Sequence, residues 1–138
     1  MKTLKKIIAF TLLALITSTA NAAGSGTAKS CVKADLTGTW TAVINDLSTS
    51  STQKCKMVVN GAGNLTSGSC KDIQTNDTYQ PSSGSATINS QCDVNISIRY
   101  TNGAVSQASG GMSRGRDTII GVYKNNYGGY GSFSAVKY

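Results

Sequence analysis

Apolar and polar residues alternate in short segments along most of the chain. In the segment VNISIRY, Val94, Ile96 and Ile98 alternate with polar residues, and clusters of Gly, Asn and Ser separate segments of this kind. A period of two residues is typical of a β-strand with one buried face. The pattern predicts strands at residues 38–45, 54–60, 64–71, 85–90, 93–101, 104–112, 117–125 and 130–137.

Two glycine turns set the expected pairing of neighbouring strands. Asn102-Gly103 favours a two-residue type I′ turn, in which both residues have a positive φ. Gly128-Gly129 favours an equivalent turn, which places Tyr127 opposite Tyr130. We then expect Tyr123, Tyr127 and Tyr130 to share one face of the C-terminal hairpin.

The N-terminal part of the chain follows a different pattern. A basic start precedes an apolar run over residues 7–16, and small residues follow as far as Ala22. This order is typical of a bacterial secretory signal peptide, and the apolar run is too short to span a bilayer. We expect a signal peptide at residues 1–22, a flexible leader at 23–30 and a single β domain at 31–138, located in the periplasm or secreted.

Four cysteines, Cys31, Cys55, Cys70 and Cys92, lie in the part predicted to be exported. An even number of cysteines in a small exported domain indicates disulfides. A turn centred on residues 61–63 places Cys55 opposite Cys70 on antiparallel strands, close enough for a disulfide after a small adjustment. Of the three possible connectivities, we therefore expect Cys55 with Cys70 and Cys31 with Cys92.

The number and spacing of the predicted strands define the fold class. About eight short strands are joined by tight turns, and no helix is predicted between them. Such strands are best closed into an antiparallel up-and-down barrel or packed as a β-sandwich. A domain of this size has a small core, so each disulfide is expected to add ~2 to 4 kcal/mol of stability.

The single tryptophan, Trp40, lies in the segment DLTGTWTAVIND. This segment resembles the first-strand signature of the lipocalin and avidin-like barrels, the calycin group. The resemblance implies that Gly38 and Trp40 lie at the closed end of the barrel and that a basic residue near the last strand, here Lys137, packs over the indole. Avidin-like biotin sites use several tryptophans, which argues against biotin. The alternative is that Trp40 is only a core residue.

Charge and residue types exclude several classes of function. Without the signal peptide, ten Lys and Arg residues remain against six Asp residues, a net charge of +4, and the cations are scattered. We therefore expect no nucleic-acid binding. The chain has no His and no Glu, and its cysteines are expected to be paired, so the usual groups for catalysis are missing. We therefore expect no enzyme activity and no cofactor. The cysteine spacing contains no C-x-x-C pair, and with no His in the chain we expect no metal site.

Two polar clusters are candidates for recognition. In SRGRD, Arg114 and Arg116 occupy alternate positions that would project from one face and suit a carboxylate, sulfate or phosphate; alternatively, Asp117 balances them. Tyrosines on an exposed face of the C-terminal hairpin would suit protein or carbohydrate contact, or else they fill the barrel.

These observations predict an exported, non-enzymatic carrier of a small apolar or amphipathic ligand. Two alternatives remain: a protein-binding module, such as an inhibitor of a protease or another enzyme, and a secreted binder of anions, polysaccharide or lipid headgroups. We expect no integral membrane association. The candidate ligand-binding residues are Trp40, Ile96, Ile98, Arg114, Arg116, Tyr123, Tyr127 and Tyr130.

Overall fold

The computed structural model describes residues 29–138, so the predicted signal peptide and most of the predicted leader lie outside the described residues. Within this part of the chain, one short 3₁₀ helix precedes nine strands of a single antiparallel sheet. The elements are η1 (Lys33–Leu36), β1 (Gly38–Asp46), β2 (Ser51–Val59), β3 (Leu65–Asp72), β4 (Thr78–Tyr79), β5 (Pro81–Ile88), β6 (Asp93–Tyr100), β7 (Val105–Met112), β8 (Thr118–Asn125) and β9 (Tyr130–Lys137).

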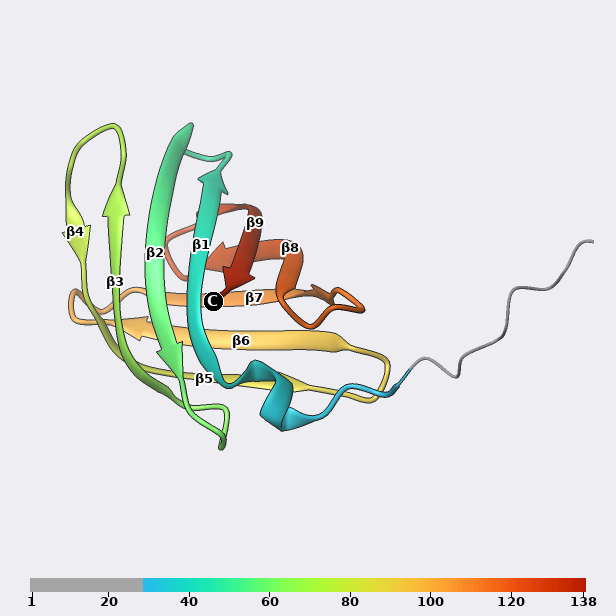
Figure 1. The fold of residues 1–138 in the computed structure, drawn as a ribbon. Coiled ribbons are helices and arrows are strands. Elements are labelled where there is room, and N and C mark those ends of the chain that lie inside the picture. The colour runs from blue at the N-terminus through green and yellow to red at the C-terminus, as the bar shows by residue number, and fades with distance from the viewer. Residues whose placement is uncertain (1–28) are drawn as a thin grey trace, which may run out of the picture.

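The sheet curls into a nearly closed barrel. Its strand order is β4-β3-β2-β1-β9-β8-β7-β6-β5, so β1 pairs with both β2 and β9. Figure 1 shows β1, β2 and β3 crossing β5, β6 and β7 on the opposite side of the barrel. The predicted all-β barrel is confirmed, and the β-sandwich alternative is not adopted.

The strand count differs from the expectation in one region. The sequence predicted about eight strands, whereas the described residues form nine, because β4 and the first half of β5 were not foreseen. A strand as short as Thr78–Tyr79 is too short to show alternation. β5 begins at Pro81, the only proline of the chain, which lacks an N–H but is tolerated at the first position of a strand.

The barrel closes between β3 and β5 without a continuous hydrogen-bonded ladder. Beside the start of β3, Asn64 forms an isolated bridge to Ser85. Next to this bridge, Leu65 packs so tightly against Gly84 that a Cβ on the glycine would lie 3.1 Å from the leucine Cβ. A side chain at position 84 of β5 would force its neighbours to shift by a few tenths of an ångström, so side-chain packing here is close and replaces part of the backbone pairing.

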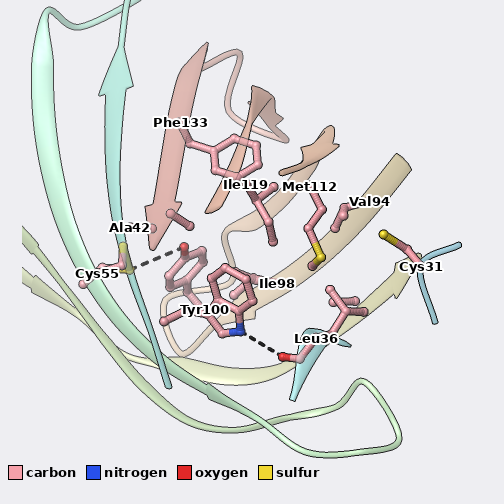
Figure 2. Close-up of a cluster of buried hydrophobic side chains, with 14 residues drawn as sticks. Cys31, Leu36, Ala42, Cys55, Val94, Ile98, Tyr100, Met112, Ile119 and Phe133 are labelled. Atoms are coloured by element: carbon pink, nitrogen blue, oxygen red, sulfur yellow. Dashed lines mark hydrogen bonds between the residues drawn. A yellow bond between two sulfur atoms is a disulfide. The ribbon is translucent and has the colours of Figure 1, made fainter. Parts of the chain in front are cut away.

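The inward residues of the strands form the core. Val94, Ile98 and Tyr100 of β6 are buried, as the alternation predicted. Figure 2 shows Ile98, Ile119 and Phe133, from three different strands, directed into the same interior space. The strands thus present one apolar face to the barrel interior and one mainly polar face to solvent.

Both predicted disulfides are confirmed. Cys55 lies directly opposite Cys70 in the pairing of β2 with β3, and Cys31 is joined to Cys92. Two disulfides indicate an oxidising compartment. None of the described helices is long and apolar enough to cross a membrane.

The type I′ turn predicted at Asn102-Gly103 is wrong. The Tyr100 N–H donates to the Ala104 carbonyl at 2.8 Å, which leaves a loop of three residues instead of two. Gly103 has a φ of 84°, whereas Asn102 does not have a positive φ. The loop is a type I turn followed by a left-handed glycine, a common three-residue hairpin connection. The Asn102 side chain stabilises this loop by accepting a hydrogen bond from the Ala104 N–H.

The C-terminal hairpin also has a three-residue loop, so the predicted tyrosine pair is wrong. The Asn125 N–H donates to the Gly129 carbonyl, and Tyr130 pairs with Lys124 instead of Tyr127. Tyr127 therefore lies in the loop. Tyr123 is buried inside the barrel, whereas Tyr127 and Tyr130 are exposed, so the three tyrosines do not share one face.

Candidate ligand site in the barrel interior

One end of the barrel is closed by η1 and Trp40. The Trp40 indole N–H donates to the Leu36 carbonyl at 2.8 Å, and the ring is only 5% exposed. The Lys137 ammonium lies 5.3 Å from the centroid of the indole ring and donates to the Asp35 carbonyl at 2.7 Å. The expectation that Lys137 packs over Trp40 is confirmed.

Arg116 belongs to this closed end and does not pair with Arg114. Its guanidinium forms an ion pair with Asp35 at 2.9 Å and donates to the carbonyls of Lys29 and Ser30, both at 3.0 Å. Arg116 is the left-handed residue of the β7–β8 loop, with a φ of 60°, so the extended geometry that would place two arginines on one face is absent. The predicted arginine pair is wrong, because Arg116 is used to fix η1 and the segment before it.

The electrostatics of the closed end favour an ionised Asp35. The Val32 N–H donates to the Asp35 carboxylate at 2.8 Å, and Arg116 lies beside it. These two contacts outweigh the effect of burial and hold the pKa of Asp35 below its usual value. Asp117, the alternative partner considered for the arginines, instead accepts hydrogen bonds from Ser113 and Thr118.

The barrel interior contains an apolar cavity of about 80 Å³. It extends from the Trp40 end towards the opposite end of the barrel. It brings together four of the predicted ligand-binding residues. Its lining is formed by Leu36, Trp40, Ala42, Ile44, Met57, Val59, Gly63, Leu65, Ser85, Ala86, Ile96, Ile98, Tyr100, Ser106, Ala108, Ile119, Tyr123, Phe133 and Ala135.

A second hollow of about 170 Å³ forms the mouth of the barrel, at the end away from η1. It shares Ile44, Tyr100, Ser106 and Tyr123 with the cavity, so the two spaces adjoin at these side chains. Its remaining lining adds amide and phenol groups. These further residues are Gln53, Tyr79, Asn102, Ala104, Asn125 and Tyr127.

Tyr123 carries a buried polar group at the junction of cavity and mouth. Its side chain is 8% exposed, and its hydroxyl forms no hydrogen bond of regular geometry within the described part of the chain. Burial, followed by a hydrogen-bonding interaction with the Asp46 carboxylate and by the charge of that group, raises the pKa of Tyr123 above its usual value. Asp46 is therefore the group with which a ligand would compete for this hydroxyl.

Asp46 is the buried carboxylate beside this hydroxyl. Burial alone would raise its pKa, but hydrogen bonds from Ser48, the interaction with the Tyr123 hydroxyl and a hydrogen bond from the backbone of Thr49 outweigh burial and hold the pKa of Asp46 below its usual value. The carboxylate is thereby engaged in shaping the β1–β2 loop at the mouth.

The structure thus unites some of the predicted site residues and separates others. Trp40, Ile96, Ile98 and Tyr123 line the cavity, and Tyr127 lines the mouth. The other three predicted residues, Arg114, Arg116 and Tyr130, line neither space. Sequence reasoning missed Tyr79, which lies in the unpredicted β4, Asn102, which lies in a misassigned turn, and Asn125, which ends a predicted strand.

These features define the class of the molecule: a nearly closed antiparallel β-barrel, capped at one end and hollow towards the other. No protein-family model matches the sequence, and no curated protein sequence matches it. Among solved structures, a de novo designed fluorescence-activating β-barrel is similar, with a TM-score of 0.63 and 13% identity over 78% of this chain and 100% of that one. A redesigned β-barrel, mFAP1, bound to DFHBI, is similar with a TM-score of 0.59 and 11% identity over the same shares. At these identities the likeness concerns the fold alone.

Proposed function

We propose that this protein is an exported, non-enzymatic binding protein that takes a small apolar or amphipathic ligand into its barrel through the mouth. The observation that carries the proposal is the apolar cavity beside a polar mouth, with which it shares four lining residues, among them Tyr123 with its buried hydroxyl. Ligand sites are usually apolar hollows with a few convergent polar groups, and the arrangement fits this description.

The volumes limit what the ligand can be. The cavity of about 80 Å³ is smaller than the ~150 Å³ apolar cavity that holds benzene, whereas drug-sized ligands occupy about 300 to 1,000 Å³. The ligand is therefore small, or it inserts one narrow apolar group into the cavity. Its polar part would remain in the mouth, where Gln53, Asn102 and Asn125 supply amide groups.

The structural comparison supports a ligand in the barrel. One similar barrel is bound to the small molecule DFHBI, and the other is described as fluorescence-activating. Export is supported by the signal-peptide pattern and by the two disulfides, which persist in oxidising compartments such as the bacterial periplasm and the extracellular space.

A second candidate function is protein recognition at the mouth end of the barrel. The Leu47 N–H donates to the Tyr130 carbonyl at 2.9 Å, so these two residues are neighbours, and both side chains are exposed. Tyr127, in the adjacent β8–β9 loop, is also exposed. Exposed apolar and aromatic side chains are typical of protein interfaces. If the protein is an enzyme inhibitor, the target enzyme would contact this end of the barrel.

Native mass spectrometry of the protein purified from its source organism tests the first candidate. We expect a discrete mass excess that is lost on denaturation. Ala108→Met should abolish the excess, because the longer side chain fills the cavity. Ser109→Met is the matched control, because it places the same side chain on the outer face of β7.

The alternative outcomes are distinct. A wild-type protein with no mass excess would contradict the carrier function and favour the protein partner. Loss of the excess in both methionine variants would indicate a nonspecific effect of the substitutions. Thermal melting of both variants shows whether each one is folded.

A further inference from the structure

Three lysines gather on the outer face of β2 and β3. Lys54 lies directly opposite Lys71, and Lys56, two residues along β2, lies opposite Ser69. Opposed residues on antiparallel strands have Cβ atoms about 4.5 to 5.5 Å apart, and like charges at this spacing are destabilising. The barrel therefore maintains a repulsive arrangement at this place.

These charges are not paired within the described part of the chain. None of the three lysines forms an ion pair with an acidic side chain of residues 29–138. Asp72, the neighbour of Lys71 in sequence, is buried and accepts hydrogen bonds from the N–H groups of Gln74 and Thr75. The positive charge on this face is thus free to attract an external anion.

The lysines line a groove of about 500 Å³. This volume lies within the range of about 300 to 1,000 Å³ that is typical of ligand sites. The groove also presents hydroxyl and amide groups, and no acidic residue lines it. Its lining consists of Thr41, Lys54, Cys55, Lys56, Ser69, Lys71, Ile73, Asn76 and Tyr138.

Tyr138 adds an aromatic ring to the groove. Its hydroxyl is hydrogen-bonded to the Thr41 hydroxyl, and its N–H donates to the Thr39 carbonyl at 3.1 Å. The side chain nevertheless remains 76% exposed. The ring is therefore held in position and is accessible to a ligand.

We propose that this groove binds an anionic oligosaccharide. The lysines would bind its sulfate or carboxylate groups, the Thr41, Ser69 and Asn76 side chains would bind sugar hydroxyls, and the Tyr138 ring would pack against a sugar ring. The site lies on the outer face of the barrel and is independent of the ligand proposed for the interior. It takes the place of the predicted Arg114 and Arg116 pair as the anion-binding surface.

Charge and shape favour this ligand over other polyanions. Single-stranded nucleic acids are bound through aromatic side chains on which successive bases stack, and this groove has one tyrosine. Binding to a lipid surface by charged segments is strengthened by an apolar face that enters the bilayer, whereas the groove contains Ile73 as its single large aliphatic residue.

Calorimetric titration of the full-length mature protein with a sulfated tetrasaccharide tests the proposal. We expect binding that weakens as salt is added, because the lysines are exposed and their charges are screened. Lys54→Gln/Lys71→Gln should weaken it by about tenfold or more, because each lysine supplies a charged hydrogen bond. Lys54→Arg/Lys71→Arg should retain it. Arg99→Gln/Lys124→Gln is the control, since it removes two exposed cations elsewhere on the barrel.

Four outcomes would overturn the proposal. The first is no binding by the wild-type protein, and the second is equal weakening in both glutamine variants, which would indicate an effect of net charge alone. The third is equally tight binding of inorganic sulfate, which would indicate a simple anion site. The fourth is binding to anionic vesicles without binding to the tetrasaccharide. Thermal melting separates loss of binding from loss of fold. Removal of opposed like charges should leave stability unchanged or raise it.

Discussion

Lys137 lies across the indole of Trp40, with its ammonium 5.3 Å from the centroid of the ring, and joins the last strand to the first at the closed end of the barrel. The same ammonium donates to the Asp35 carbonyl, so one side chain contacts both the floor of the barrel and the helix that covers it. Asp35 in turn holds Arg116 from the β7–β8 loop. The closed end is thus a connected network, which leaves the opposite end as the route into the cavity.

The contact between Lys137 and Trp40 predicts a loss of stability when the ammonium is removed. Lys137→Met keeps most of the aliphatic stem but removes the cation–π interaction and the hydrogen bond to Asp35. We expect the free energy of unfolding to fall by about 1 to 2 kcal/mol, measured by urea denaturation. Lys124→Met, at an exposed position of β8, should change it by less than about 0.5 kcal/mol. Equal effects of the two substitutions would show that the Trp40 contact contributes nothing.

The ion pair of Asp35 with Arg116 predicts a dependence of stability on pH. The pKa of Asp35 is lowered in the folded protein, so its contribution is present above the unfolded pKa of about 4 and is lost as the pH falls through the folded pKa. Asp35→Asn keeps an acceptor for the Val32 N–H but loses the charge. We expect this variant to be about 1 to 2 kcal/mol less stable at pH 7.

The pH profile distinguishes this interpretation from simple loss of packing. As the pH falls below about 4, the wild-type protein should lose stability more steeply than Asp35→Asn, so that the two curves converge in acid. Parallel curves from pH 7 to pH 2 would contradict a role for the Asp35 charge. Denaturant titrations at each pH provide the comparison.

The two disulfides should differ in their effect on stability. Cys31 and Cys92 are 61 residues apart in sequence, whereas Cys55 and Cys70 are 15 apart. Because a crosslink that closes a longer loop restricts the unfolded chain more, we expect Cys31→Ala/Cys92→Ala to cost about 4 kcal/mol and Cys55→Ala/Cys70→Ala about 3 kcal/mol. Calorimetric melting of both variants checks the order. A reversed order would show that packing around the buried Cys55 and Cys70 outweighs chain entropy.

Local patterns in the sequence predicted most strands because alternation over eight residues, as in β6, directly reflects burial of one face. The same patterns could not locate β4, which is only two residues long. They also could not define the loop geometry. A two-residue type I′ hairpin needs a positive φ at both Asn102 and Gly103, whereas the observed three-residue loop has a positive φ at Gly103 alone.

The candidate site was only partly predictable for a related reason. Ile96 and Ile98 belong to a strongly alternating strand, so their place in the barrel wall follows from the pattern. The partner of Arg116, in contrast, lies 81 residues away in sequence, and only the closure of the barrel brings Asp35 beside it. Tyr123 was grouped with Tyr127 and Tyr130, and the register of β8 with β9 separated its face from theirs.

The buried hydroxyl of Tyr123 leads to a prediction that separates stability from function. Tyr123→Phe removes a hydroxyl that forms no hydrogen bond of regular geometry with the described residues and only a weaker interaction with the Asp46 carboxylate, so the free energy of unfolding should change by less than about 1 kcal/mol. Ligand binding should weaken, because a ligand acceptor in the mouth would lose its donor, and the ligand-bound fraction in the native mass spectrum should fall. Tyr130→Phe, on the exposed face of β9, should change neither quantity. A Tyr123→Phe protein that is clearly less stable but retains its ligand would show that the hydroxyl serves the fold and not the site.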